Sequence, residues 1–211
     1  EYIVKKYNLN VGSQYFVDIP NVGRDNMAEL FAELGFKVGT EIGVECGGYS
    51  EVLCRANPNL QLFCIDPWSA GAYESGIHAV DEEQRKYNER YAECVVRLFP
   101  YHTTIIRKGS MDALDDFPDN SLDFVYIDAN HDFPNFTNDI HNWIKKVKIG
   151  GIVSGHDYAF FSYKKHNHVK RALQAYARCY RMIPLFIIGA GEYKEGTLRD
   201  KYRSWMWVKD K

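Results

Sequence analysis

The 211-residue sequence has almost no net charge, because 26 Lys and Arg against 28 Asp and Glu give a formal charge of −2. Without a basic excess it offers no electrostatic footprint for nucleic acid or for an anionic membrane surface. It also lacks a signal-peptide pattern and any run of about 18 apolar residues, the length of a membrane-spanning helix. We therefore expect no nucleic-acid or membrane partner, which leaves small molecules.

Cysteine is scarce, odd in number and without a CxxC pair. Most of the five cysteines lie within apolar patterns, which is typical of buried thiols in a reducing compartment. We therefore expect a cytoplasmic protein. Internal repeats and low-complexity linkers are absent too, and the length suits one core. We predict a single domain over residues 1–211, and the oligomeric state stays open, a dimer included.

Apolar periodicity predicts an alternation of helices and strands. Five short apolar strands, ending near Gly43, Asp66, Lys108, Asp128 and Asp157, are separated by helical patterns, and two more runs cover 183–188 and 204–209. This order favours an α/β fold, a Rossmann-like doubly wound sheet that is mostly parallel with an antiparallel C-terminal edge hairpin. We predict a helical N-terminal extension over 1–36. Our hypothesis for 67–80 is a lid insertion that covers a bound ligand.

A glycine-rich turn follows the first of these strands, in the run Glu41-Ile42-Gly43-Val44-Glu45-Cys46-Gly47-Gly48. Glycine allows a tight turn and a close approach of ligand to backbone, and the next helix start favours an anionic group. About 20 residues further on, Asp66 ends a strand where a carboxylate can accept ribose hydroxyls. A dinucleotide site would show GxGxxG, but Glu45 replaces its second glycine and would repel a diphosphate. The pattern favours S-adenosylmethionine, which has no phosphate, over NAD.

Two strand ends, 29 residues apart, carry acid and imidazole: Asp128 with His131, and His156 with Asp157. If the strands are parallel neighbours, about 4.8 Å apart, these side chains converge where open α/β folds bind ligands. Two carboxylates with open positions suit Mg²⁺, which would lower the pKa of a substrate hydroxyl. His131 is placed to take the proton.

At these residues the chain resembles the class I S-adenosylmethionine-dependent methyltransferases, from about residue 24 onward. Three sequence motifs are similar to those of a subgroup that includes macrolide-sugar (macrocin- and mycinamicin-type) O-methyltransferases. They are Glu-Ile-Gly-Val-x-x-Gly-Gly, Ile-Asp-x-x-His and Gly-Gly-x-x-x-Gly-His-Asp-Tyr. The resemblance implies cofactor contacts of three kinds. The methionine end would be held by Glu41, Gly43 and Gly47, the ribose by Asp66, and the adenine bordered by Ser110 and Met111, with Asp128 beside the cofactor.

The same resemblance implies the reacting groups. Asp128 would be a metal ligand and His131 the catalytic histidine, with Asp128 assisting it. The subgroup supplies two further acidic ligands from the next strand end, but here the first of them is His156, followed by Asp157. The expected metal ligands are therefore Asp128, His156 and Asp157.

The expected activity is methyl transfer from S-adenosylmethionine to a hydroxyl of a small-molecule acceptor, such as a sugar or natural product, with Mg²⁺ as an optional assistant. Two alternatives stay open. One is a metal-independent transferase on oxygen or nitrogen that uses His131 as base. The other is a non-catalytic S-adenosylmethionine-binding module.

Overall fold

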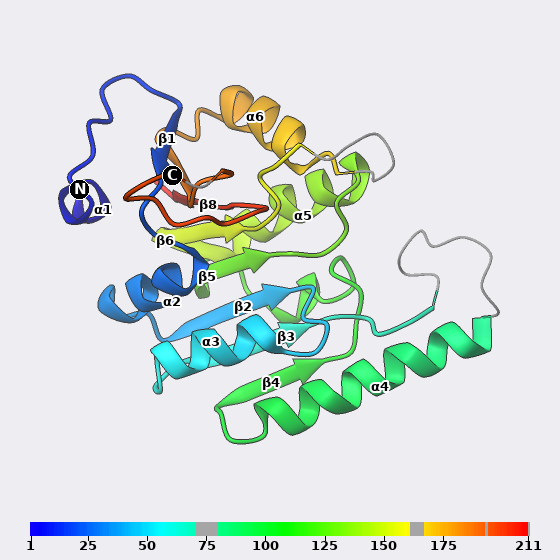
Figure 1. Cartoon of the computed structure of the whole chain (residues 1–211). Helices are drawn as coiled ribbons and strands as arrows, with labels where there is room; N and C mark the ends of the chain where they lie inside the picture. Colours follow the sequence, from blue (N-terminus) through cyan, green and yellow to red (C-terminus); the bar gives the residue numbers. More distant parts are fainter. Residues whose placement is uncertain (71–79, 161–166, 193, 211) are drawn as a thin grey trace.

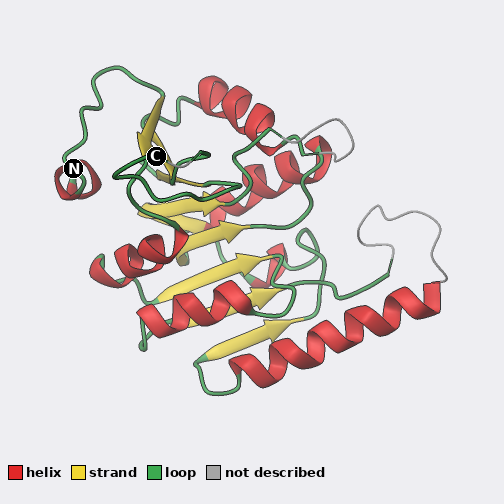
Figure 2. Ribbon diagram, in the orientation of Figure 1, coloured by secondary structure: helices red, strands yellow, loops and turns green. Residues whose placement is uncertain are grey.

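The computed structural model describes residues 1–70, 80–160, 167–192 and 194–210, and these form one eight-stranded sheet between two layers of helices (Figures 1 and 2). The spatial order of the strands is β1-β7-β8-β6-β5-β2-β3-β4. The elements are α1 (Tyr2–Lys6), β1 (Phe16–Ile19), α2 (Arg24–Glu33), β2 (Val38–Ile42), α3 (Gly48–Ala56), β3 (Gln61–Ile65), α4 (Val80–Leu98), β4 (Thr103–Ile106), a 3₁₀ turn η1 (Leu114–Asp116), β5 (Leu122–Ile127), α5 (Phe133–Lys146), β6 (Val147–Gly155), α6 (Val169–Tyr180), β7 (Leu185–Ile188) and β8 (Ser204–Val208).

The strand directions match the predicted fold class. Strands β2 to β6 pair in parallel, whereas β8 runs antiparallel to both β6 and β7. In the register of β5 and β6, Ile127 lies opposite Gly155, so Asp128 and His156 follow at the same edge. The sequence order reverses at β2, which lies between β3 and β5. Such a switch point is where open α/β sheets bind ligands.

The prediction of a helical extension over 1–36 was wrong in one respect. Residues Phe16–Ile19 form β1, which pairs in parallel with β7 and extends the sheet beyond the C-terminal hairpin. Four residues are too few to show a periodicity, and the hydrogen bonds that make them a strand come from residues 185–188. The sequence alone therefore gave no strand signal here. Helix α2 was predicted, and Gly35 follows it with a positive φ of 72°.

The strands alternate their side chains between two apolar layers. On β5, Phe124 and Tyr126 join the layer that packs against α2, α3 and α4, and Val125 and Ile127 join the layer under α5 and α6. Each such side chain contributes roughly 1.5–3 kcal/mol when fully buried. Figure 1 shows the carboxyl ends of β2 to β6 at one edge of this sandwich.

Two further sequence predictions concern the lid and membrane-spanning helices. Most of the expected lid, residues 71–79 of 67–80, lies outside the described residues. Among the helices that are described, none combines the length and apolar character needed to cross a bilayer.

Candidate functional site

The glycine turn after β2 brings two strand ends into contact. Gly43 has a φ of 86°, and a Cβ atom there would lie 2.2 Å from the carbonyl oxygen of Asp128. Only glycine tolerates both the conformation and this approach. Gly47, the residue before α3, also has a positive φ of 76°, and its missing Cβ makes room for Leu98 of α4. Gly43 therefore lines the site, and Gly47 allows α4 to pack closely, while a role of Gly47 in cofactor binding stays a prediction.

Asp66 holds the glycine turn in shape. Its side chain is 3% exposed, and one carboxylate oxygen accepts hydrogen bonds from the backbone N–H groups of Val44 and Glu45, at 3.1 and 3.0 Å. The other oxygen accepts one from Trp68 N–H at 2.8 Å. Each carboxylate oxygen can accept two hydrogen bonds, so these backbone contacts do not exclude a ribose contact. Binding of the ribose by Asp66 therefore stays a prediction beside its structural role.

A cavity of about 450 Å³ collects half of the predicted site residues. Its lining includes Glu41, Gly43, Asp66, Asp128 and His131. These residues come from the ends of three neighbouring strands, β2, β3 and β5, and from the loops that follow them. The cavity therefore joins the predicted methionine and ribose contacts to the predicted reacting groups.

Glu41 is a buried acid in this cavity. Its side chain accepts a hydrogen bond from the Ser50 hydroxyl, but burial dominates and raises the pKa of Glu41 to about 8. The carboxyl group is therefore mostly neutral at pH 7 in the ligand-free protein. An ammonium group placed beside it would favour the ionised form.

Sequence reasoning missed Arg24, the first residue of α2, which lines the same cavity. Its guanidinium lies over the ring of Tyr49, 4.9 Å from the ring centre, and 3.9 Å from a carboxylate oxygen of Asp128. The Tyr49 hydroxyl in turn donates a hydrogen bond to the Arg24 carbonyl. A lone arginine at a helix start gives no sequence signal. Arg24 reaches the cavity because α2 packs against α3.

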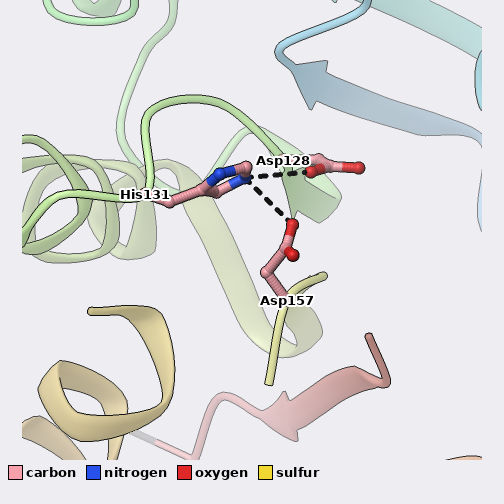
Figure 3. A group of neighbouring side chains, drawn as sticks. All are labelled: Asp128, His131 and Asp157. Atoms are coloured by element: carbon pink, nitrogen blue, oxygen red, sulfur yellow. Dashed lines mark ion pairs between the residues drawn. The ribbon is translucent and has the colours of Figure 1, made fainter. Parts of the chain in front are cut away.

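The predicted reacting groups do converge. Figure 3 shows the His131 ring pointing toward both carboxylates. Its Nε2 lies 2.9 Å from Oδ2 of Asp157 and 3.5 Å from Oδ1 of Asp128. One ligand atom from each of these three residues lies within 4.8 Å of the others. Asp157 has a φ of 61°, a strained conformation for a non-glycine residue, and Asn167 donates hydrogen bonds to it. Such strain at a ligand edge is typical of functional sites.

His156 lies behind this group. Its Nδ1 is 3.4 Å from Oδ2 of Asp157 and 3.8 Å from Oδ2 of Asp128, and its Nε2 is 3.7 Å from Oδ1 of Asp200. His156 does not line the cavity that holds Asp128 and His131. The three-residue group thus contains His131 in the place where we expected His156, and the role of His156 as a ligand stays a prediction.

The carboxylates control the protonation of both imidazoles. Burial alone would lower the pKa of His131, but Asp128 and Asp157 outweigh it and raise the pKa to about 10. Burial is likewise outweighed at His156, where Asp157 and Asp200 raise the pKa to about 9. Burial would raise the pKa of Asp157, yet the two histidines hold it far below its usual range. In the absence of a cation, His131 is therefore an imidazolium at neutral pH.

The geometry fits a divalent cation. Among the described residues, Nε2 of His131 is the buried side-chain nitrogen or oxygen that lacks a well-aligned hydrogen bond, although two carboxylates surround it. A cation between Asp128, His131 and Asp157 would satisfy all three groups. Two oxygen ligands and an imidazole are less selective for Mg²⁺ than an all-oxygen site. This ligand set can also bind Mn²⁺ or Zn²⁺.

A second cavity, of about 500 Å³, adjoins the first and shares Gly43, Ala129 and Asn130 with it. Its lining includes Ser110 and Met111, which were expected to border the adenine. It also includes Asp139 of α5. Asp139 is buried, with 4% of its surface exposed, and it accepts a hydrogen bond from the Ser110 hydroxyl.

Comparison with known proteins agrees with this geometry. A family model described as a methyltransferase domain matches residues 40–158, more than half of the chain. An uncharacterised protein, y4gI of Sinorhizobium fredii, is 26% identical over 123 residues, which cover 57% of this chain and 12% of that protein. The chain thus spans about an eighth of the length of this curated relative.

Solved structures share the fold. The O-methyltransferase TomG from Streptomyces achromogenes, involved in tomaymycin synthesis and solved in complex with SAM, has a TM-score of 0.57 and 16% identity over 88% of this chain and 79% of its own. A putative caffeoyl-CoA O-methyltransferase from Staphylococcus aureus has a TM-score of 0.60 and 11% identity over 98% and 89%. The chain belongs to the methyltransferase-domain family, and its fold is that of the class I S-adenosylmethionine-dependent methyltransferases.

Proposed function

We propose that the protein transfers a methyl group from S-adenosylmethionine to a hydroxyl of a small polyhydroxylated acceptor, such as a sugar or natural product, with help from a divalent cation. The observation that carries the proposal is the convergence of Asp128, His131 and Asp157 beside the cavity that holds Glu41 and Asp66. The five cysteines are all unpaired thiols, which supports our proposal of a cytoplasmic location.

Different residues of the chain would bind the cofactor and assist methyl transfer. Glu41 and Arg24 are placed to hold the ammonium and carboxylate groups of a methionine moiety. The Asp128 carboxylate on the cavity wall would accept the proton that the acceptor hydroxyl loses, and Asp157 adds negative charge beside it. A bound divalent cation would lower the pKa of that hydroxyl. An acceptor held at these strand ends would lie beside the methyl group, and alignment of the reacting atoms would lower the barrier.

A metal-free transferase with His131 as base fits the structure less well. The imidazole is protonated at neutral pH when it lies between two carboxylates, since its pKa is raised to about 10. An imidazolium cannot accept a proton. The geometry therefore supports His131 as a ligand or as a partner of the two acids.

Removal of metal tests the proposal. We expect dialysis against EDTA to abolish most methyl transfer from radiolabelled S-adenosylmethionine to a panel of sugars and glycosides. Without a cation, Asp128 and Asp157 would pair only with the protonated His131, and the pKa of the acceptor hydroxyl would not be lowered. Activity should return on addition of Mg²⁺ or Mn²⁺. Full activity in EDTA would reject the metal-assisted version and leave the metal-independent one. Cofactor binding without transfer to any acceptor would favour a non-catalytic module.

Loss of the Arg24 charge should weaken cofactor binding. We expect Arg24→Met to lower affinity for S-adenosylhomocysteine roughly tenfold or more, because a hydrogen bond between charged groups is lost. Isothermal titration calorimetry measures this change. An analogue without the carboxylate is the control, because wild type and variant should bind it equally well. Equal loss for both ligands would mean that Arg24 acts on the fold and not on the carboxylate.

A further inference from the structure

A group of cations at the start of α6 takes no part in the reaction proposed above. From Tyr158 to Gly191 the sequence has six Lys or Arg residues and no Asp or Glu, although the whole chain has a formal charge of −2. Two of these cations, Lys170 and Arg171, lie in the first turn of α6. We call these two side chains the α6 cation pair.

The α6 cation pair contacts aromatic rings. Lys170 Nζ lies 4.2 Å from the ring centre of Phe160 and 5.0 Å from that of Tyr158, and the Arg171 guanidinium lies 5.3 Å from the centre of the Phe160 ring. Phe160 is 62% exposed, so solvent and ligands can reach this group. Within the described part of the chain, neither cation forms an ion pair with a carboxylate. Two cations on an exposed ring, without a counter-charge, suit the binding of an anion.

The acid that faces Lys170 is already paired with another residue. Burial lowers the pKa of Lys170, the positive charge of Arg203 lowers it further, and the charge of Asp18 acts in the opposite direction. Asp18 accepts a hydrogen bond from the Arg203 guanidinium in an ion pair. One acid therefore faces two cations here, and Arg171 adds a further positive charge. The surface keeps an excess of positive charge that an anionic ligand would neutralise.

The α6 cation pair lies close to the proposed reacting groups. Asn167, two residues before α6, donates hydrogen bonds to Asp157. His168, the N-cap residue, donates its backbone N–H to the His131 carbonyl at 2.7 Å. The cation pair follows these contacts within about one helical turn, a rise of about 5 Å. Figure 1 shows α6 beginning on the side of the molecule at which β5 and β6 end. An acceptor whose hydroxyl lies at the acids could therefore reach the cation pair with a substituent.

We propose that the α6 cation pair binds a phosphate group of the acceptor, so that the methylated hydroxyl belongs to a sugar phosphate or a nucleoside diphosphate sugar. The inference rests on the proposed transfer to a polyhydroxylated acceptor and narrows its class. A phosphate group has several acceptor oxygens, which a guanidinium and an ammonium group can bind together. A carboxylate has only two oxygens and suits the pair less well. A neutral glycoside would leave both cations without a counter-charge.

The test compares the binding of three probes, glucose, glucose 1-phosphate and uridine diphosphate glucose, by calorimetry. S-adenosylhomocysteine and EDTA are present, so that no divalent cation bridges a phosphate to the acids. We expect at least one phosphate probe to bind the wild type roughly tenfold or more tightly than glucose, the effect of a hydrogen bond between charged groups. The tighter of the two phosphate probes distinguishes a monophosphate from a diphosphate acceptor. The double variant Lys170→Gln with Arg171→Gln should reduce this preference to less than about threefold.

Arg178→Gln is the matched control. Arg178 lies on the same helix about two turns further on, where its guanidinium is 5.0 Å from the centre of the Phe16 ring. This variant should keep the wild-type affinity for both phosphate probes. A loss as large as that of the double variant would indicate a polyanion bound along α6 and would overturn the proposal. Thermal melts of all variants confirm that they are folded.

Two further outcomes would overturn the proposal while leaving the proposed function intact. One is equal binding of all three probes to the wild type. The other is a phosphate preference that the double variant keeps. By contrast, the absence of methyl transfer to every acceptor, with or without phosphate and with Mg²⁺ supplied, would overturn the proposed function, and this proposal with it.

Discussion

Asp128→Asn is expected to lower methyl-transfer turnover by roughly a hundred- to a thousandfold, while affinity for S-adenosylhomocysteine changes by less than about tenfold. Asp128 is the one described residue whose carboxylate lies within 4 Å of charged groups on Arg24, His131 and His156. Asparagine keeps its shape but removes the negative charge that a cation or an imidazolium requires. Single-turnover and steady-state kinetics separate the loss of chemistry from the loss of binding.

Asp132→Asn provides the control for this change. Asp132 precedes α5 and accepts a hydrogen bond from Asn135 N–H at 3.0 Å. Asparagine is an equally good residue at this helix-capping position, so turnover should stay within about twofold of wild type. A turnover of Asp128→Asn within about fivefold of wild type would reject Asp128 as a catalytic residue. A parallel loss in both variants would point to the loop conformation.

Glu41→Gln is expected to stabilise the ligand-free protein while weakening cofactor binding. In the folded protein burial raises the pKa of Glu41 to about 8, so between pH 4.5 and 8 the folded state binds more protons than the unfolded state. Stability contributed by this group therefore falls as the pH rises through that window. Glutamine cannot ionise in either state and avoids this loss. At pH 7 the free energy of unfolding should rise by about 1–3 kcal/mol.

The opposite effect is expected on binding, because a neutral amide attracts the ammonium group of the cofactor much less than a carboxylate does. Affinity for S-adenosylhomocysteine should fall roughly ten- to a hundredfold. Urea denaturation at pH 5 and pH 8, with calorimetry at pH 7, measures both effects. The stability gain should be larger at pH 8.

Glu45→Gln is the stability control, because Glu45 lines the same cavity but its side chain is 67% exposed. The free energy of unfolding of Glu45→Gln should depend on pH in the same way as that of the wild type. A stability gain of Glu41→Gln that is the same at pH 5 and pH 8 would show that ionisation of Glu41 does not limit stability. Unchanged affinity would remove Glu41 from the cofactor site.

Opposing effects of one substitution on stability and binding are typical of functional sites. In this protein the strained residue Asp157 and the buried acid Glu41 both lie at the carboxyl edge of the sheet. The buried Glu41 carboxyl lowers stability when it ionises, and an ammonium group beside it would offset that cost.

The sequence by itself determined the sheet class and the edge of the sheet at which the candidate site residues gather. Apolar runs that end in Gly43, Asp66, Asp128 and Asp157 were enough, because parallel strands bring their carboxyl ends to one edge whatever packs around them. That single rule placed the glycine turn beside the acids. It also explains why His131, four residues after the end of β5, was found.

Tertiary structure alone decided the contacts made between distant elements. Arg24 enters the site because α2 packs on α3, and β1 is a strand because β7 supplies its hydrogen bonds. Asp139 had a weak sequence signal, since helical spacing from Phe136 and Trp143 places it on the inner face, yet its charge argued for the surface. The protonation of His131 depends on Asp157, 26 residues away along the chain and 2.9 Å away in space. Burial and charge at a point depend on everything packed around it, and local pattern does not contain that information.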